Sequence, residues 1–286
     1  MSETRILVAG LPSSGKSTYI GLFFMAIETA TGPIRMTGFQ GDVEYVNSLA
    51  DRLSRCEEAV RTDINLVDGF NADLVADDGT EFSLRLPDYS GETWKTALEA
   101  RGWAESVQED VERSSGICLF IKVGALVNDG TIRDARRHIA SLADHPLNSG
   151  GDDIEEVPDA EVVSAATTQV ALVDLLQVLT NRRRGGHCRL SIVLSAFDLA
   201  GNLSPAEWLG SNLPLLGQFL RSNRAEIESR IFGTSAQGGR FDQQESKAEL
   251  LERPALDRAY VRDGAGEAVS LEAPILWAAG IGANGV

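Results

Sequence analysis

The sequence predicts an α/β fold, in which a mostly parallel six-stranded sheet is flanked by helices. Segments with strand-like and helix-like patterns alternate along most of the chain, as they do when helices connect parallel strands. The runs GICLFIKV and LSIVLSA are largely apolar, as expected of central strands covered on both faces. We expect one domain over residues 1–286, with insertions at about 33–70 and 124–165 and a polar segment at about 238–266.

The first third of the chain predicts a strand, two helices and a hairpin. Residues 5–9 are nearly all apolar and predict a central strand, and 16–30 carry apolar side chains at helical spacing. In 43–60 the apolar positions recur every three or four residues between charged ones, which indicates an amphipathic helix. Residues 72–76 and 82–86 predict two strands that are joined by a tight Asp-Asp-Gly turn.

The middle of the chain predicts two more buried strands, with helices between them. The strands are 116–123 and 190–196, and the helical patterns are 131–142 and 165–181. Residues 148–161 are rich in Asp and Glu and contain glycine, so we expect a surface insertion there.

The last third predicts a helix, a sixth strand, a polar loop and a final helix. Ser204-Pro205 resembles a helix start, and an amphipathic pattern continues to about residue 230. The sixth strand lies in SRIFGTS. Residues 238–266 are polar and weakly patterned, which predicts loop or partial disorder, and 272–279 predict a short helix.

The composition excludes several classes of partner. The formal net charge of −16 and the pI of about 4.6 argue against binding to nucleic acid or anionic lipid, because both would be repelled. No run approaches the roughly 20 apolar residues of a membrane span. Cys56, Cys118 and Cys188 are odd in number and far apart, which favours free thiols in a reducing compartment. We expect a soluble, cytoplasmic protein.

The stretch GLPSSGKST fits the phosphate-binding pattern G-x-x-x-x-G-K-[ST], between a predicted strand and a predicted helix. Gly10 and Gly15 allow the tight turn that directs backbone N–H groups at phosphate oxygens. Lys16 would neutralise the β- and γ-phosphates, and the Ser17 hydroxyl would bind Mg²⁺. The remaining predicted contacts of the loop are Ser13, Ser14 and Thr18.

The stretch PDYSGE follows the second strand of the hairpin and matches the pattern D-x-x-G. Asp88 would lie at the carboxyl end of a strand, beside the phosphate loop, where it can reach the metal directly or through water. Gly91 would offer its N–H to the γ-phosphate, so that the segment senses the third phosphate.

Two further stretches predict how the base is recognised. Asp198 ends the stretch LSAFD, and its carboxylate can accept hydrogen bonds from both N1–H and the 2-amino group of guanine, a pair that adenine lacks. A helix-cap or turn aspartate is the alternative. In GTSAQ, the Ala236 N–H would donate to the guanine O6, with Ser235 beside it.

The ordered set GLPSSGKS, DYSG, SAFD and TSAQ resembles the G1, G3, G4 and G5 motifs of the Ras-like GTPases of the TRAFAC class of P-loop NTPases, over residues 10 to about 237. The resemblance implies a six-stranded, small-GTPase-like sheet, binding of GTP, GDP and Mg²⁺, and slow hydrolysis. It also implies switch loops that engage protein effectors or an activator. The catalytic residues would be Lys16, Gly91 and Glu92.

The chain departs from the pattern of these GTPases at several positions. Ser195 and Ala196 replace the usual Asn or Thr and Lys of the fourth motif, and stacking by Phe197 is an alternative way to cover the base. Glu92 stands where a water-orienting glutamine is common, and a carboxylate near a triphosphate would be repelled or protonated. Hydrolysis is therefore expected to be slow or dependent on a partner. Thr62 is the candidate for the magnesium-binding threonine of switch I, with Arg61 beside it.

The long helix before the hairpin, the acidic insertion and the tail LEAPILWAAG are similar to the bacterial double-GTPase proteins, which are associated with conflict and antiviral systems. Taken together, the motifs lead us to expect a GTPase that acts as a molecular switch or assembly factor in a bacterial multi-protein system. Two alternatives stay open. One is a P-loop ATPase or small-molecule kinase, in which Asp88 serves as a Walker-B carboxylate or a substrate base. The other is a scaffold that holds GTP without hydrolysing it.

Overall fold

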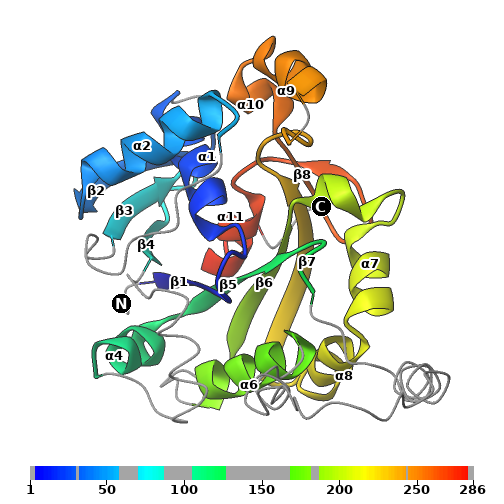
Figure 1. Ribbon diagram of the computed structural model, residues 1–286. Helices are drawn as coiled ribbons and strands as arrows, with labels where there is room; N and C mark the ends of the chain where they lie inside the picture. The colour runs from blue at the N-terminus through cyan, green and yellow to red at the C-terminus, as the bar shows by residue number, and fades with distance from the viewer. Residues whose placement is uncertain are drawn as a thin grey trace, which may run out of the picture.

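The structure is a computed structural model that describes residues 4–29, 32–57, 70–86, 105–126, 168–181, 187–242 and 244–282. These residues form a nine-stranded sheet in the order β2-β3-β4-β1-β5-β6-β7-β8-β9 (Figure 1). The strands are β1 (Thr4–Gly10), β2 (Ile34–Gln40), β3 (Phe70–Ala76), β4 (Glu81–Leu86), β5 (Gly116–Lys122), β6 (Cys188–Ser195), β7 (Ile227–Ser235), β8 (Tyr260–Arg262) and β9 (Ala268–Val269).

The sheet confirms the α/β class, but the prediction of six mostly parallel strands is wrong. The strands β4, β1, β5, β6 and β7 pair in parallel, as expected of the apolar runs. Both sides of this centre continue with antiparallel pairs, so that four neighbouring pairs are parallel and four are antiparallel. The unpredicted strands β2, β8 and β9 are edge or near-edge strands. Two of them span three residues or fewer, which is too short to show a period of two.

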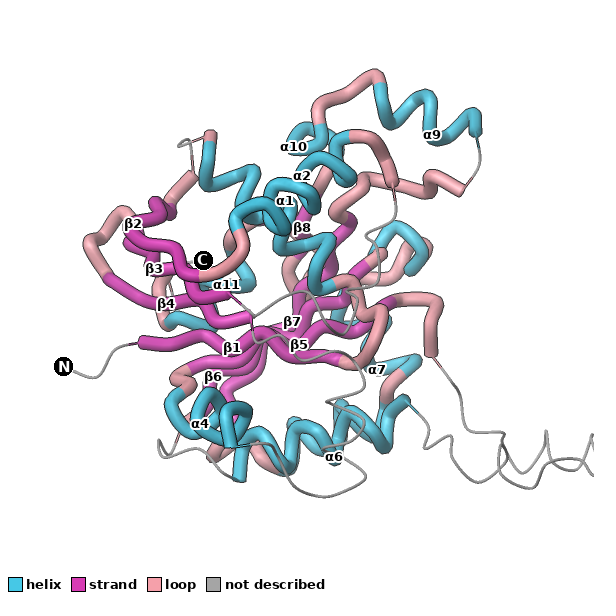
Figure 2. Tube along the Cα trace, turned by 60° about the vertical axis from the view of Figure 1, so that its left-hand side comes forward, coloured by secondary structure: helices cyan, strands magenta, loops and turns pink. Residues whose placement is uncertain are grey.

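Helices cover both faces of the sheet (Figure 2). They are α1 (Lys16–Glu28), α2 (Val43–Ser54), α4 (Glu105–Arg113), α6 (Thr168–Asn181), α7 (Pro205–Asn212), α8 (Pro214–Ser222), α9 (Gln244–Leu251), α10 (Ala255–Arg258) and α11 (Ala273–Ala279), with the 3₁₀ helix η1 (Phe197–Ala200).

The central strand β1 contributes side chains to both hydrophobic cores. Ile6 and Val8 pack with α1 and α11 on one face, and Leu7 and Ala9 pack with α6, α7 and α8 on the other. This alternation follows from the period of two along a strand. Because β1 lies between β4 and β5, its carboxyl end at Gly10 reaches the middle of the sheet edge, where open α/β sheets bind ligands.

Several predicted helices are confirmed with different boundaries. The amphipathic helix of 43–60 ends at Ser54, and its N-cap Asp42 accepts a hydrogen bond from Tyr45 N. The pattern after Ser204 forms two helices, α7 and α8, because Pro214 begins a new helix after the non-helical Leu213. The final helix is α11, and 165–181 correspond to α6. The predicted helix at 131–142 and the acidic insertion at 148–161 lie outside the described residues.

The prediction that 238–266 form a loop or disordered segment is wrong. The described part of this range contains α9, α10 and β8, and β8 pairs with β7 and β9. The segment lacks a clear apolar period because each of these elements is short. No helix in the described part of the chain is long and apolar enough to cross a membrane.

A test of this packing compares two glycines. A Cβ atom at Gly116, the first residue of β5, would lie 2.1 Å from the carbonyl oxygen of Ala278 in α11. We expect Gly116→Ala to lower the free energy of unfolding by about 1–3 kcal/mol, because α11 must shift. Gly210 in α7 has no atom within 4 Å of such a Cβ, so Gly210→Ala should raise it by about 0.5–1 kcal/mol. Urea denaturation measures both free energies of unfolding. If Gly116→Ala and Gly210→Ala have the same free energy of unfolding, the placement of α11 against β5 is contradicted.

Candidate nucleotide-binding site

The loop between β1 and α1 contains two glycines whose backbone conformation other residues rarely adopt. Gly10 has φ +149° and Gly15 has φ +84°, and Ser13 between them has φ +57°. A Cβ atom at Gly10 would lie 2.6 Å from the Phe120 carbonyl oxygen, and one at Gly15 would lie 2.6 Å from Ser195 Oγ. Both conformation and space therefore require glycine at these positions, as the sequence pattern predicts.

The Lys16 ammonium lies inside the curve of this loop. Its Nζ donates hydrogen bonds to the carbonyl oxygens of Gly10 at 2.7 Å and Leu11 at 2.9 Å, and to Ser14 Oγ at 3.1 Å. Burial lowers the pKa of Lys16 from 10.5 to about 8. Lys16 is also the first residue of α1, where the helix dipole adds positive potential. The loop is thus suited to hold an anion such as a polyphosphate.

Helix α2 reaches the residue that is predicted to bind magnesium. The Tyr45 hydroxyl lies 3.5 Å from Ser17 Oγ, in the first turn of α1. The sequence analysis missed Tyr45, because a tyrosine near the start of an amphipathic helix cannot be distinguished from a core residue. The hydroxyl of Ser17 is a hard oxygen donor, which suits Mg²⁺.

A hydrogen bond joins the phosphate loop to the strand that precedes the predicted base-binding aspartate. Ser195, the last residue of β6, is buried, and its hydroxyl donates to the Ser14 carbonyl oxygen at 2.7 Å. Ala196 then adopts a left-handed conformation with φ +51° and caps the 3₁₀ helix η1, which carries Asp198. Ser195 thus links the phosphate loop, through its side chain, to the η1 segment that carries Asp198.

The two segments predicted to recognise the base meet in the structure. Ser235 Oγ donates to Asp198 Oδ1 at 2.7 Å and accepts from the Gly238 N–H at 3.1 Å. Ser235 is the last residue of β7 and is 1% exposed, and Ala236 follows it. Because β6 and β7 pair in parallel, their carboxyl ends lie side by side. This pairing brings Asp198 and Ser235 together although they are far apart in the sequence.

The alternative that Phe197 stacks on a base is wrong. Its ring is 5% exposed and belongs to the core on the α6 face of the sheet. A Cβ atom at Gly233 of β7 would lie 2.5 Å from Phe197 Cγ, so the ring packs directly on the strand backbone.

Five of the predicted site residues lie outside the described residues: Arg61, Thr62, Asp88, Gly91 and Glu92. Their roles stay predictions. Among the described residues, no three His, Cys, Asp or Glu side chains form a group that could hold a metal ion.

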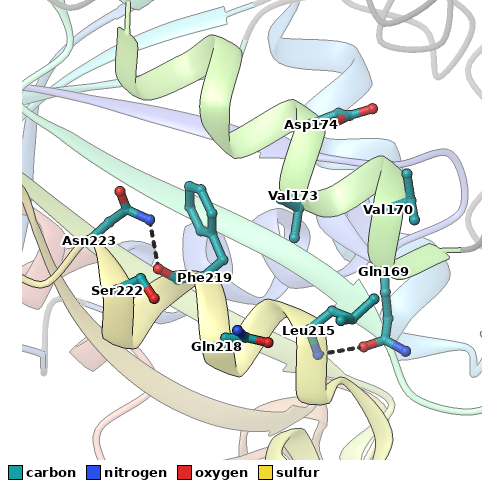
Figure 3. Close-up of a pocket in the computed structure, with 9 residues that line it drawn as sticks. All are labelled: Gln169, Val170, Val173, Asp174, Leu215, Gln218, Phe219, Ser222 and Asn223. Carbon is teal, nitrogen blue, oxygen red and sulfur yellow. Dashed lines mark hydrogen bonds between the residues drawn. The ribbon is translucent and has the colours of Figure 1, made fainter.

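A separate groove lies between α6 and α8 (Figure 3). It has a volume of about 330 Å³. Leu215 N donates to Gln169 Oε1 at 2.9 Å, and Asn223 Nδ2 donates to the Phe219 carbonyl oxygen at 2.7 Å. The groove belongs to the helix layer on the opposite face from α1, and no residue of the phosphate loop lines it. It is therefore distinct from the phosphate loop.

One family model matches almost the whole chain. It describes the Double-GTPase 1 family and covers residues 7–278, a range that contains every predicted site residue. No curated protein matches the chain significantly.

Two solved structures are also similar to this chain. The signal recognition particle receptor SRb in its GTP/SRX complex from Chaetomium thermophilum is 14% identical, with a TM-score of 0.42 and coverage of 88% of this chain and 99% of that chain. The putative nucleolar GTP-binding protein 1 from Plasmodium falciparum is 12% identical, with a TM-score of 0.37 and 88% coverage of both chains. Likenesses at these identities and scores are too weak to indicate a function.

Burial of Lys16 predicts a pH-dependent stability. Because its pKa is lowered from 10.5 to about 8, the unfolded chain binds more protons at this side chain than the folded chain between these values. We therefore expect the free energy of unfolding of the nucleotide-free protein to rise with pH over this interval, by at most about 1.4 kcal/mol per pH unit. Urea denaturation of the wild type and of Lys16→Met at about pH 7.5 and about pH 9.5 measures this. The same slope in both proteins would show that Lys16 does not cause it.

Proposed function

Because the chain belongs to the Double-GTPase 1 family, we propose that it binds GTP and GDP in the site built around Lys16 and Asp198. It hydrolyses GTP slowly, with Mg²⁺, and acts as a molecular switch or assembly factor through protein partners. The observation that carries this proposal is the hydrogen bond from Ser195 Oγ to the Ser14 carbonyl oxygen. It joins a loop suited to phosphate to the segment that carries an acceptor for a base, so that one nucleotide can engage both.

Lys16 and the start of α1 would hold the phosphates. The ammonium already has three oxygen partners within the loop at 2.7–3.1 Å, and phosphate oxygens are stronger, charged acceptors for the same protons. Bound phosphate would also favour the charged form of a lysine whose pKa is lowered by burial.

Ser17 would bind Mg²⁺, together with Asp88 and Thr62 as the sequence predicts. The ion would neutralise the charge on the phosphates when it is bound. Tyr45 lies close enough to Ser17 to orient its hydroxyl. Glu92 in place of a neutral, water-orienting side chain supports slow hydrolysis or a need for a partner.

Asp198 would select guanine. A carboxylate only accepts hydrogen bonds, and guanine offers two adjacent donors at N1 and the 2-amino group. The hydrogen bond from Ser235 holds one carboxylate oxygen in place, which supports a fixed orientation toward a base.

Calorimetric titration of nucleotide-free protein with GTPγS and ATPγS, in the presence of Mg²⁺, tests the phosphate site and the preference for the base. We expect the wild type to bind GTPγS at least about 100-fold more tightly than ATPγS, because adenine lacks the donor pair. Lys16→Ala should weaken binding of GTPγS by about 100-fold through loss of a charged hydrogen-bond donor. Lys247→Ala on α9 removes the same charge outside the phosphate loop and should leave the affinity unchanged.

Phosphate release from GTP, followed in parallel, separates a slow GTPase from a scaffold that does not hydrolyse. Preference for ATPγS would instead favour the ATPase or kinase alternative and contradict the proposal.

The substitution Asp198→Asn tests base selection directly. An amide presents a donor as well as an acceptor, so it opposes one donor of guanine but can pair with the 2-oxo group of xanthine. We expect the affinity for GDP to fall by about 100-fold and that for xanthosine diphosphate to rise. Asp174→Asn on α6, on the opposite helix layer from α1, is the matched control. If Asp198→Asn keeps the preference for GDP, another residue selects the base.

A further inference from the structure

Arg258, at the end of α10, is a buried cation with only neutral partners among the described residues. The residue is 4% exposed, and no carboxylate in the described part of the chain forms a salt bridge with its guanidinium. Its Nη atoms donate instead to carbonyl oxygens where α2 and α9 end and to one side-chain amide: Leu53, Ser54, Leu250, Arg253 and Gln237.

Burying this charge is costly, because a guanidinium loses its hydration and neutral carbonyls compensate only in part. The carboxyl ends of α2 and α9 supply the compensation, since the last carbonyls of a helix carry partial negative charge. The Nε atom has no partner among the described residues. A displacement of these segments would leave the buried charge without its acceptors, so Arg258 favours the arrangement in which the acceptors surround it.

Arg258 contacts the turn that follows β7, at residues 236–238. Gly238 has φ +78°, and a Cβ atom there would lie 2.2 Å from the Arg258 carbonyl oxygen, so the turn packs against the Arg258 backbone. Gln237, which is 8% exposed, lies between two partners: its Oε1 accepts from Arg258 Nη2 at 3.5 Å, and its Nε2 donates to the Glu57 carbonyl oxygen at 3.4 Å.

The same turn sets the direction of the hydroxyl that contacts Asp198. The Gly238 N–H donates to Ser235 Oγ, so the hydroxyl is an acceptor on that side and gives its single proton to Asp198 Oδ1. A displacement of residues 237 and 238 would remove the first hydrogen bond and leave the Ser235 hydroxyl, and with it the carboxylate, free to rotate.

We propose that Arg258 is a positioning residue for base recognition, which holds the turn at 236–238 and thereby orients Asp198 for two simultaneous hydrogen bonds to guanine. This inference rests on the proposed function. The property it controls is discrimination between guanine and hypoxanthine. Guanine needs both contacts aligned, whereas hypoxanthine lacks the 2-amino group and needs only one.

The test measures by calorimetry how tightly GDP and inosine diphosphate bind to the nucleotide-free protein of residues 1–286. We expect the wild type to prefer GDP by at least about tenfold, the effect of one charged hydrogen bond. Arg258→Lys keeps the charge, but one ammonium cannot reach both helix ends and Gln237. The affinity for GDP should fall by about tenfold and that for inosine diphosphate by less than about twofold.

Two further variants complete the design. Gln237→Leu keeps Arg258 and removes only the amide, so it should reduce the preference for GDP in the same direction and provides the test if Arg258→Lys does not fold. Arg262→Lys is the matched control, because the Arg262 guanidinium donates to the Gly266 carbonyl oxygen in an exposed contact. It should leave the preference unchanged.

The outcomes separate this inference from the proposed function. If the wild type binds no guanine nucleotide, both are overturned. If the wild type prefers GDP and the folded variants keep the same ratio of affinities, only the role of Arg258 is overturned. An equal loss of affinity for both nucleotides also overturns it, because this would reveal a general structural effect.

Discussion

The hydrogen bond from the Ser195 hydroxyl to the Ser14 carbonyl oxygen joins two segments whose strands, β1 and β6, are separated in the sheet by β5. The hydrogen bond needs glycine at position 15, because a Cβ atom there would overlap the Ser195 side chain. In the fourth motif of the Ras-like GTPases an Asn or Thr is usual where Ser195 stands. The bond depends on parallel pairing, which places the carboxyl ends of these strands at the same edge.

Two cationic side chains, the partly buried Lys16 and the buried Arg258, contribute to the candidate site, and their chemistry differs. The Lys16 ammonium is a flexible point charge inside the phosphate loop, and burial has lowered its pKa. A bound anion would therefore stabilise the charged form of Lys16. The planar fork of the Arg258 guanidinium instead spans the ends of two helices. The first is suited to binding a ligand and the second to holding protein segments in one arrangement.

Helix α2 connects these two regions. Near its start, Tyr45 contacts Ser17, and at its end, the Leu53 carbonyl accepts from Arg258. The amphipathic face of α2 buries Val46, Leu49 and Leu53. An insertion between the first helix and the hairpin thus touches both the predicted metal-binding and the base-binding side of the site. The C-terminal segment, with α9 and α10, completes the same assembly and makes the sheet wider than predicted.

The sequence by itself determined the central strands and the phosphate loop, because apolar runs of full strand length and a glycine pattern between strand and helix are local signals. Asp198, Ser235 and Ala236 were predicted for the same reason, from short motifs at strand ends. The contacts of Tyr45 and Arg258, the buried position of Phe197 and the strands β2, β8 and β9 were decided only by the tertiary structure. Their environments come from segments distant in sequence: a buried arginine is recognisable only once the carbonyls of α2 and α9 surround it, and strands as short as β8 and β9 are defined by the strands that pair with them.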